Sequence, residues 1–193
     1  MIQFEGRLIE RKNFDKNNEL IDKQSFEVGK ITKSNDLYLI KIHTKTFDNR
    51  EKLIEEFTIV YKCKPKQSSL MLMILPFTKS KSNQKTMVIA KSSDFKKLYD
   101  LDNLKNIELE LELESGLLKA LGSKSKIKMY DRYIVLKGNE KIIESKVDLK
   151  MYALGIRVKS LKYKVIEKFT QEEILFFQKF VKNDGSYFTV TYL

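Results

Sequence analysis

The chain has 193 residues, of which 42% are hydrophobic and 33% charged, and a formal net charge of +11. This length and apolar content allow one domain with its own core, and they exclude a disordered chain. The only cysteine is Cys63 and the only histidine is His43, which excludes an intramolecular disulfide and a zinc site of cysteine and histidine ligands, and we assign no catalytic role to His43.

The N-terminal half alternates between apolar and polar residues, which predicts strands. We expect these strands at 2–10, 25–32, 37–47, 53–64, 69–78 and 86–90. Asp48 and Glu51 have the spacing of a helix capping box, but the alternation from Leu53 onward favours a strand after them. A short helix is expected after Ser92 or Ser93.

The C-terminal half is predicted to mix strands with two short helices. We expect strands at 107–114, 124–129, 133–137, 140–149, 155–166 and 186–193. The segment GLLKAL at 116–121 has helix-capping residues on both sides, and Thr170 and Glu173 form a capping box for a helix that ends near Lys182. The predicted fold class is α+β, predominantly antiparallel β-sheet with about three short helices. It forms a single domain, 1–193, with a division into two β-rich halves near residue 91 as the alternative.

A row of glutamates alternates with leucines from Glu108 to Glu114, and lysines alternate with the same period from Lys124 to Lys128. Alternation with period two places each charged row on one face of its strand. Because opposite charges across strands contribute roughly 0.2–1 kcal/mol per pair, we expect these two strands to be neighbours. We interpret the glutamate row as structural.

Two stretches are strongly basic. Nine lysines and one acid lie between Lys62 and Lys97, and six basic residues and one acid lie between Lys150 and Lys168. A change in the apolar–polar alternation near Ser160 predicts a β-bulge, which would bring the basic side chains of the second stretch onto one face of the strand. Such rows can follow a phosphate backbone, and the alternative is a solvated lysine-rich face. The candidate nucleic-acid-binding residues are Lys62, Lys64, Lys66, Arg157, Lys159, Lys162 and Lys164.

A hairpin with a turn at Gly138-Asn139 would place Asp131, Glu144 and Lys146 on one face of the sheet. This arrangement resembles the pattern of the PD-(D/E)XK nucleases, although Tyr130 stands in place of the proline. The resemblance implies a metal-dependent nuclease in which the two carboxylates hold a divalent metal and the lysine helps to activate or orient water. The alternative is an exposed ion pair between Asp131 and Lys146.

No glycine-rich phosphate loop is present, so we expect no cofactor. The N-terminal sequence MIQFEGRLIERK has charges where a signal peptide would be apolar, and the longest apolar run, LMLMILPF, is too short to span a bilayer. We therefore expect a cytoplasmic, non-enzymatic protein that binds nucleic acid or another polyanion and no membrane. The alternatives are a protein-interaction module or inhibitor and the nuclease. The C-terminal strand, if it lies at a sheet edge, would pair with a partner or a second copy.

Overall fold

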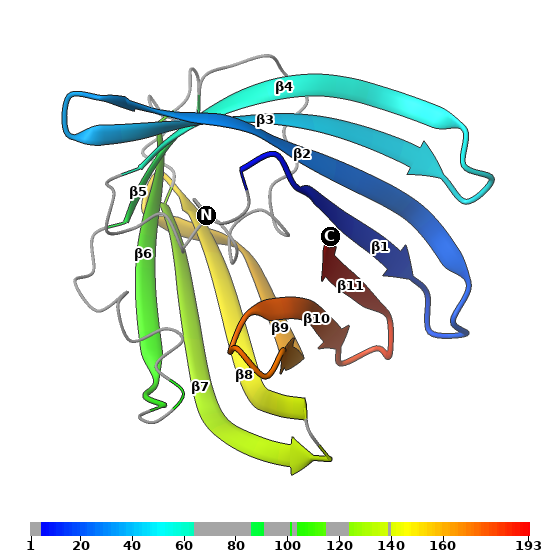
Figure 1. Ribbon diagram of the computed structural model, residues 1–193. Helices are drawn as coiled ribbons and strands as arrows, with labels where there is room; N and C mark the ends of the chain where they lie inside the picture. Colours follow the sequence, from blue (N-terminus) through cyan, green and yellow to red (C-terminus); the bar gives the residue numbers. More distant parts are fainter. Residues whose placement is uncertain (1–4, 64–85, 91–100, 102–103, 115–123, 139) are drawn as a thin grey trace.

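The computed structural model describes residues 5–63, 86–90, 101, 104–114, 124–138 and 140–193. Eleven strands in these residues form one sheet that closes into a barrel (Figure 1). The strands follow one another round the barrel in chain order, and β1 closes it by pairing with both β2 and β11. All neighbours are antiparallel except β4 and β5, which run parallel. The bounds are β1 Leu8–Phe14, β2 Leu20–Ser34, β3 Leu37–Asp48, β4 Leu53–Cys63, β5 Thr86–Ala90, β6 Ile107–Glu114, β7 Lys124–Lys137, β8 Glu140–Ala153, β9 Ile156–Phe169, β10 Leu175–Lys182 and β11 Tyr187–Tyr192.

The described residues contain no helix, so the predicted α+β class is wrong and this part of the chain is all-β. The helix predicted from Thr170 to Lys182 is the strand β10, in which Leu175, Gln178 and Phe180 are buried. The helices predicted after Ser92 and in GLLKAL lie outside the described residues.

The error at β10 comes from a hairpin turn with the residue spacing of a capping box. The amide of Thr170 donates to the carbonyl of Ile174 at 2.9 Å, and the amide of Glu173 donates to the carbonyl of Thr170 at 3.0 Å. The Thr170 hydroxyl accepts from the Ile174 amide at 3.2 Å, and Glu173 has a left-handed φ of 60°. In both structures the first side chain accepts a backbone N–H a few residues later, so the spacing alone does not distinguish them.

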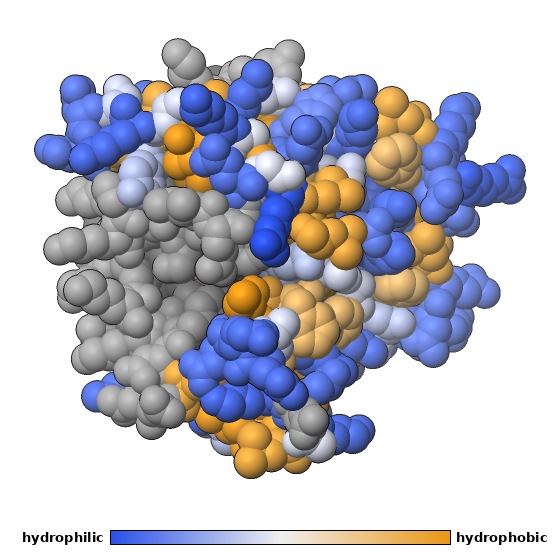
Figure 2. Space-filling model, in the orientation of Figure 1, coloured by the Kyte–Doolittle hydropathy of each residue, from blue (hydrophilic) through white to orange (hydrophobic). Residues whose placement is uncertain are grey.

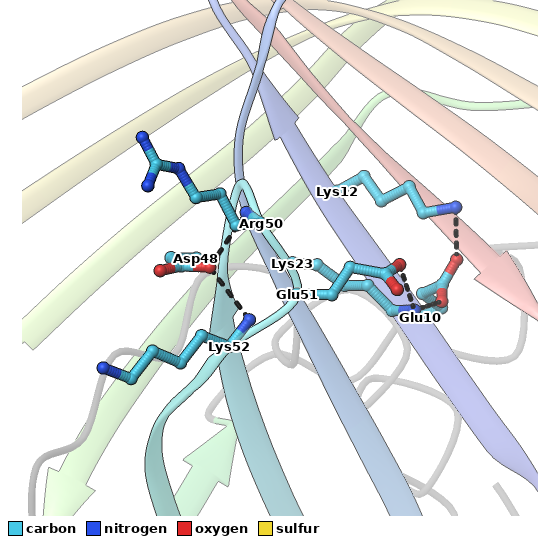
Figure 3. Close-up of polar contacts among 7 residues, drawn as sticks. All are labelled: Glu10, Lys12, Lys23, Asp48, Arg50, Glu51 and Lys52. Carbon is cyan, nitrogen blue, oxygen red and sulfur yellow. Dashed lines mark hydrogen bonds and ion pairs between the residues drawn. The ribbon is translucent and has the colours of Figure 1, made fainter.

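The same turn joins β3 to β4. The Asp48 carboxylate accepts the backbone amides of Arg50 and Lys52, each at 2.9 Å (Figure 3). Glu51 takes the left-handed position, with a φ of 62°. Here the sequence favoured the strand over the helix, and the strand from Leu53 is confirmed.

The core lies inside the barrel and is built from the inward side chains of most of the strands. One register row also places polar groups inside: Glu167, Gln178 and Val190 are successive cross-strand partners, followed by Arg11 and Gln24. The amide of Gln178 donates to Glu167 at 2.7 Å and its carbonyl accepts from the Tyr192 hydroxyl at 2.6 Å. Hydrogen bonds of this kind offset the cost of burying polar groups. The buried apolar side chains include Ile9, Phe26, Val28, Ile40, Ile42, Ile59, Tyr61, Ile143, Val147, Val165, Phe169, Phe180 and Phe188.

Candidate functional site

The hairpin of β8 and β9 extends past its neighbour β10. Its two strands pair from Lys141 opposite Phe169 to Ala153 opposite Ile156. The last partner of β9 on β10 is Tyr163, which pairs with Lys182. In the described part of the chain, residues 156–162 of β9 therefore have a neighbouring strand only on the β8 side.

The tip of this hairpin is apolar and exposed. Leu154 is 70% exposed, Ile156 69% and Val158 63%. Leu154 and Gly155 form the turn, with φ values of 52° and 76°. Two successive positive φ values are typical of a two-residue hairpin turn, where asparagine or glycine is the favoured residue at the first position. The tip thus presents a leucine at a position that favours a polar or glycine residue.

Basic residues dominate the segment around the tip, and their one acidic cross-strand partner in the described strands is Asp148 of β8, opposite Lys162. The segment from 150 to 164 has five basic residues and no acid. None of the five has an ion-pair partner among the described residues, whereas the lysines at 12, 23, 45, 141, 146 and 168 each have one. The five are Lys150, Arg157, Lys159, Lys162 and Lys164.

The predicted bulge lies nearer the tip than Ser160. Met151 pairs with Lys159 and Tyr152 with Arg157, so the extra residue is Val158. Cross-strand partners project to the same side of a sheet. Arg157 therefore shares the outer face with Lys162 and Lys164, whose neighbour Tyr163 is buried inside, and Lys159 belongs to the other face.

The first basic stretch does not join this surface. Lys62 is half-buried on β4 opposite Leu39, and β4 and β9 are not neighbours in the sheet. Lys64 and Lys66 lie outside the described residues.

The predicted nuclease residues lie on the β7–β8 hairpin but have separate partners. Lys137 pairs with Glu140 and Tyr133 with Glu144, as predicted, and a bulge then places Tyr130 opposite Lys146. Lys146 Nζ lies 2.8 Å from Asp131 Oδ2, whereas Glu144 accepts the Tyr133 hydroxyl at 2.6 Å.

These groups form exposed surface contacts. The hydrogen bond to Asp131 raises the pKa of Lys146, and the hydrogen bond to Glu144 raises the pKa of Tyr133. Among the described residues, no three His, Cys, Asp or Glu side chains are grouped to hold a metal ion. The arrangement corresponds to the alternative explanation, an exposed Asp131–Lys146 ion pair.

The glutamate row has the predicted register. Glu108 lies opposite Lys128, Glu110 opposite Lys126, and Glu112 opposite Lys124. The pairing of β6 with β7 that the two charged rows predicted is therefore confirmed.

His43 lies on the outer side of β3 between two side chains of β4. Its Nδ1 is 3.0 Å from Thr58 Oγ1 and its Nε2 is 2.7 Å from Glu56 Oε1. This order of hydroxyl, imidazole and carboxylate also occurs in hydrolases, but such enzymes need N–H donors aimed at an oxyanion. The β3–β4 ladder uses the backbone at these positions, and we assign no catalytic role to His43.

The predicted C-terminal strand is present as β11. It pairs with β1 on one side and β10 on the other, so it has no open edge for a partner. Within the described ranges, no helix combines the length and hydropathy needed to cross a bilayer.

No family model matches this chain, and no curated protein is significantly similar to it. A solved structure from Bacteroides fragilis, provisionally described as an exported protein with a YmcC-like fold, is similar over 97% of this chain and 94% of its own, with 13% identity and a TM-score of 0.47. A second, from Parabacteroides distasonis and provisionally described as a lipoprotein, is similar over 98% and 94%, with 10% identity and a TM-score of 0.47.

These descriptions bear on two predictions from the sequence. One names an exported protein and the other a lipoprotein, and neither names an intracellular nucleic-acid-binding protein. The predicted cytoplasmic location and nucleic-acid-binding function differ from these descriptions, and neither is carried further. A likeness this distant says nothing further about the activity of the chain.

Proposed function

We propose that the protein attaches to anionic lipid surfaces through the end of the β8–β9 hairpin. The observation that carries this proposal is the exposed apolar tip in a segment without acidic residues, whose five basic residues have no ion-pair partner among the described residues. Apolar side chains that enter the boundary between headgroups and acyl chains, flanked by lysine and arginine, are the usual design of an interfacial anchor. The sequence alone led us to expect no membrane contact, and the exposure of Leu154, Ile156 and Val158 changes that expectation.

The electrostatic and apolar contributions are of similar size. Lysine or arginine within about a Debye length of an anionic leaflet contributes roughly 1 kcal/mol per residue, so the three basic residues nearest the tip, Lys150, Arg157 and Lys159, contribute at most about 3 kcal/mol. A fully buried aliphatic side chain contributes about 1.5–3 kcal/mol, and transfer of the exposed two thirds of each tip side chain contributes about 1–2 kcal/mol. Stable attachment therefore requires anionic headgroups and the apolar tip together.

The geometry places Arg157 beside the tip, and Lys162 and Lys164 about 20–26 Å from Ile156 along β9 at about 3.3 Å per residue. The apolar residues occupy the turn and the positions next to it, while Arg157, Lys162 and Lys164 follow along the outer face of β9. Tyr152, half-buried at the base of the tip, has the side-chain type favoured at the level of lipid headgroups.

Vesicle co-sedimentation tests the proposal. We expect the full chain to bind vesicles of phosphatidylcholine with roughly 30% phosphatidylglycerol, and binding to weaken as salt rises from about 0.05 M to about 0.3 M because screening shortens the reach of the charges. Ile156→Ser should weaken binding about 5- to 30-fold, corresponding to about 1–2 kcal/mol. The matched control is Ile54→Ser on β4, a side chain that is 62% exposed and belongs to a different hairpin.

Three outcomes would overturn the proposal. The first is no binding to anionic vesicles at low salt. The second is equal loss in Ile156→Ser and Ile54→Ser, which would show that any exposed apolar residue suffices. The third is that Ile156→Ser binds vesicles as strongly as wild type does, and that both proteins also bind a soluble polyanion such as polyglutamate equally. This result would show a nonspecific charge effect.

A further inference from the structure

In the part of the chain that the structure describes, one segment of β7 has no neighbouring strand on its β6 side. β6 pairs with β7 only from Lys124 to Met129, and Tyr133–Lys137 pairs with β8 alone among the described strands. The segment is also apolar and accessible: Tyr133 is 52% exposed, Ile134 38% and Leu136 73%. Figure 2 shows apolar surface at the lower rim of the molecule, where Figure 1 places the end of this hairpin.

The turn identifies which backbone groups face outward. Lys137 pairs with Glu140 across a two-residue turn, and the closing pair of such a turn is hydrogen-bonded. Hydrogen-bonded and non-hydrogen-bonded pairs alternate along an antiparallel ladder. Tyr133, Val135 and Lys137 therefore bond to β8, and Ile134 and Leu136 direct their N–H and C=O groups away from it.

The open edge of β9 differs from the β7 edge in its charge. It includes Arg157, Lys159 and Lys162, and basic side chains at a sheet edge commonly protect it against the addition of another strand. The β7 edge has only Lys137, at its end. The surrounding hairpin, 131–146, has four basic and three acidic residues, so it is nearly neutral in a chain of charge +11.

We propose that the β7 edge pairs with the same edge of a second copy, antiparallel about a two-fold axis at Val135. Four backbone hydrogen bonds then join Ile134 and Leu136 to Leu136 and Ile134 of the second copy. The same pairing places an isoleucine opposite a leucine twice on one face and a tyrosine opposite a lysine twice on the other, so the edge is complementary to itself.

This contact closes on itself, because each copy uses the same edge, and it gives dimers without longer assemblies. The paired segment is five residues long, far below a standard stable interface of about 1,600 Å², so the dimer dissociates in the micromolar range or more weakly. The inference does not depend on lipid attachment, which involves the other end of β8.

Analytical ultracentrifugation of the full chain without lipid tests the inference. We expect the weight-average mass to rise from monomer to dimer with concentration, and Leu136→Lys to remain monomeric. Leu136→Pro should act in the same way, since it removes an N–H that faces outward and leaves the β8 ladder intact. The control Ile54→Lys changes an exposed residue of another hairpin and should dimerise like wild type. A monomeric wild type up to about 1 mM, or dimers of unchanged strength in Leu136→Lys, would overturn the inference.

Cross-linking tests the register. With Cys63 replaced by serine, Val135→Cys should form a disulfide-linked dimer under oxidation, because directly opposed residues in a non-hydrogen-bonded pair lie about 4.5 Å apart. Ile134→Cys should not, since its counterpart lies two positions along the strand, beyond the reach of about 7 Å for a disulfide. Equal cross-linking at both positions would refute the two-fold axis at Val135.

Discussion

Replacement of Gln178 by leucine should be among the most destabilising changes in the barrel. Gln178 is fully buried and is the cross-strand partner of Glu167, to which it donates at 2.7 Å, while it accepts the Tyr192 hydroxyl at 2.6 Å. Leucine keeps the volume but removes both hydrogen bonds. Loss of a hydrogen bond to a buried carboxylate costs about 1.5–3 kcal/mol, and a buried hydroxyl without its acceptor about 1–3 kcal/mol. We therefore expect a loss of about 3–5 kcal/mol, a large part of the 5–15 kcal/mol that holds a typical domain folded.

The assay is urea unfolding followed by far-ultraviolet circular dichroism, since the chain has no tryptophan for fluorescence. The control is a double-mutant cycle with Tyr192→Phe. Phenylalanine removes the hydroxyl that Gln178→Leu would leave without an acceptor, so the double variant should be more stable than the sum of the single losses predicts, by about 0.5–3 kcal/mol. A loss below about 1 kcal/mol in Gln178→Leu, or strict additivity with Tyr192→Phe, would refute the reasoning.

Three further changes test other parts of the structure. Burial, and then the charge of Glu167, raise the pKa of Tyr192 well above 10. The stabilising contribution of the neutral hydroxyl is therefore present below pH 10 and falls as pH rises further. In urea unfolding between about pH 9 and about pH 11, Tyr192→Phe should lose less stability than wild type. Burial raises the pKa of Glu10, but the ion pairs with Lys12 and Lys23 outweigh it and the pKa lies below 4.5, so Glu10→Gln should cost stability at neutral pH and less as pH falls below 4.5 (Figure 3). Glu51→Gly should raise thermal stability by up to about 1 kcal/mol, because glycine has no penalty at a φ of 62°; a loss would show that the 3.8 Å contact with Lys23 matters more.

Most of the described strands and two of their registers were predictable because local patterns determine them, whereas β10 was predicted as a helix. The alternation from Ile107 to Glu114 gave the bounds of β6, and the two charged rows gave its pairing with β7. The turn after Lys137 fixed the start of the β7–β8 register. Closure into a barrel was not predictable in this way, since the pairing of β1 with β11 joins the two ends of the chain.

The helix at Thr170 failed for a local reason. Its apolar positions, including Ile174, Phe177 and Phe180, fit a helical period, and the spacing of Thr170 and Glu173 fits a cap. In the structure, Gln178 and Phe180 are buried two residues apart, which is the period of a strand. The inward position of Gln178 is polar, so the hydrophobic pattern of the sequence does not show this period. Because this row of inward side chains is polar, hydrophobic periodicity does not predict the strand.

The basic residues of the candidate site could be predicted from the sequence, but its exposed apolar tip could not, and the tip determines which anionic partner the site suits. The bases from Lys150 to Lys164 are evident from composition, and alone they indicate any polyanion. Ile156 and Val158 look like the inner face of a strand, and they are exposed because β10 pairs with β9 no further than Tyr163. How far a neighbouring strand reaches is a property of the whole sheet, so whether an apolar residue fills a core or forms a tip cannot be decided locally.

The two ends of β8 are suited to different partners for the same physical reason. β8 has 14 residues and is about 45 Å long, so its two hairpin ends are well separated in space. At one end the open edge has basic side chains, which oppose pairing with another strand and favour binding to anionic headgroups. At the other, the edge has apolar side chains and few charges, which favours a strand of like sequence. Attachment to a lipid surface would concentrate copies of the chain and strengthen a weak contact at the far end, so vesicle binding should become steeper with protein concentration in wild type than in Leu136→Lys.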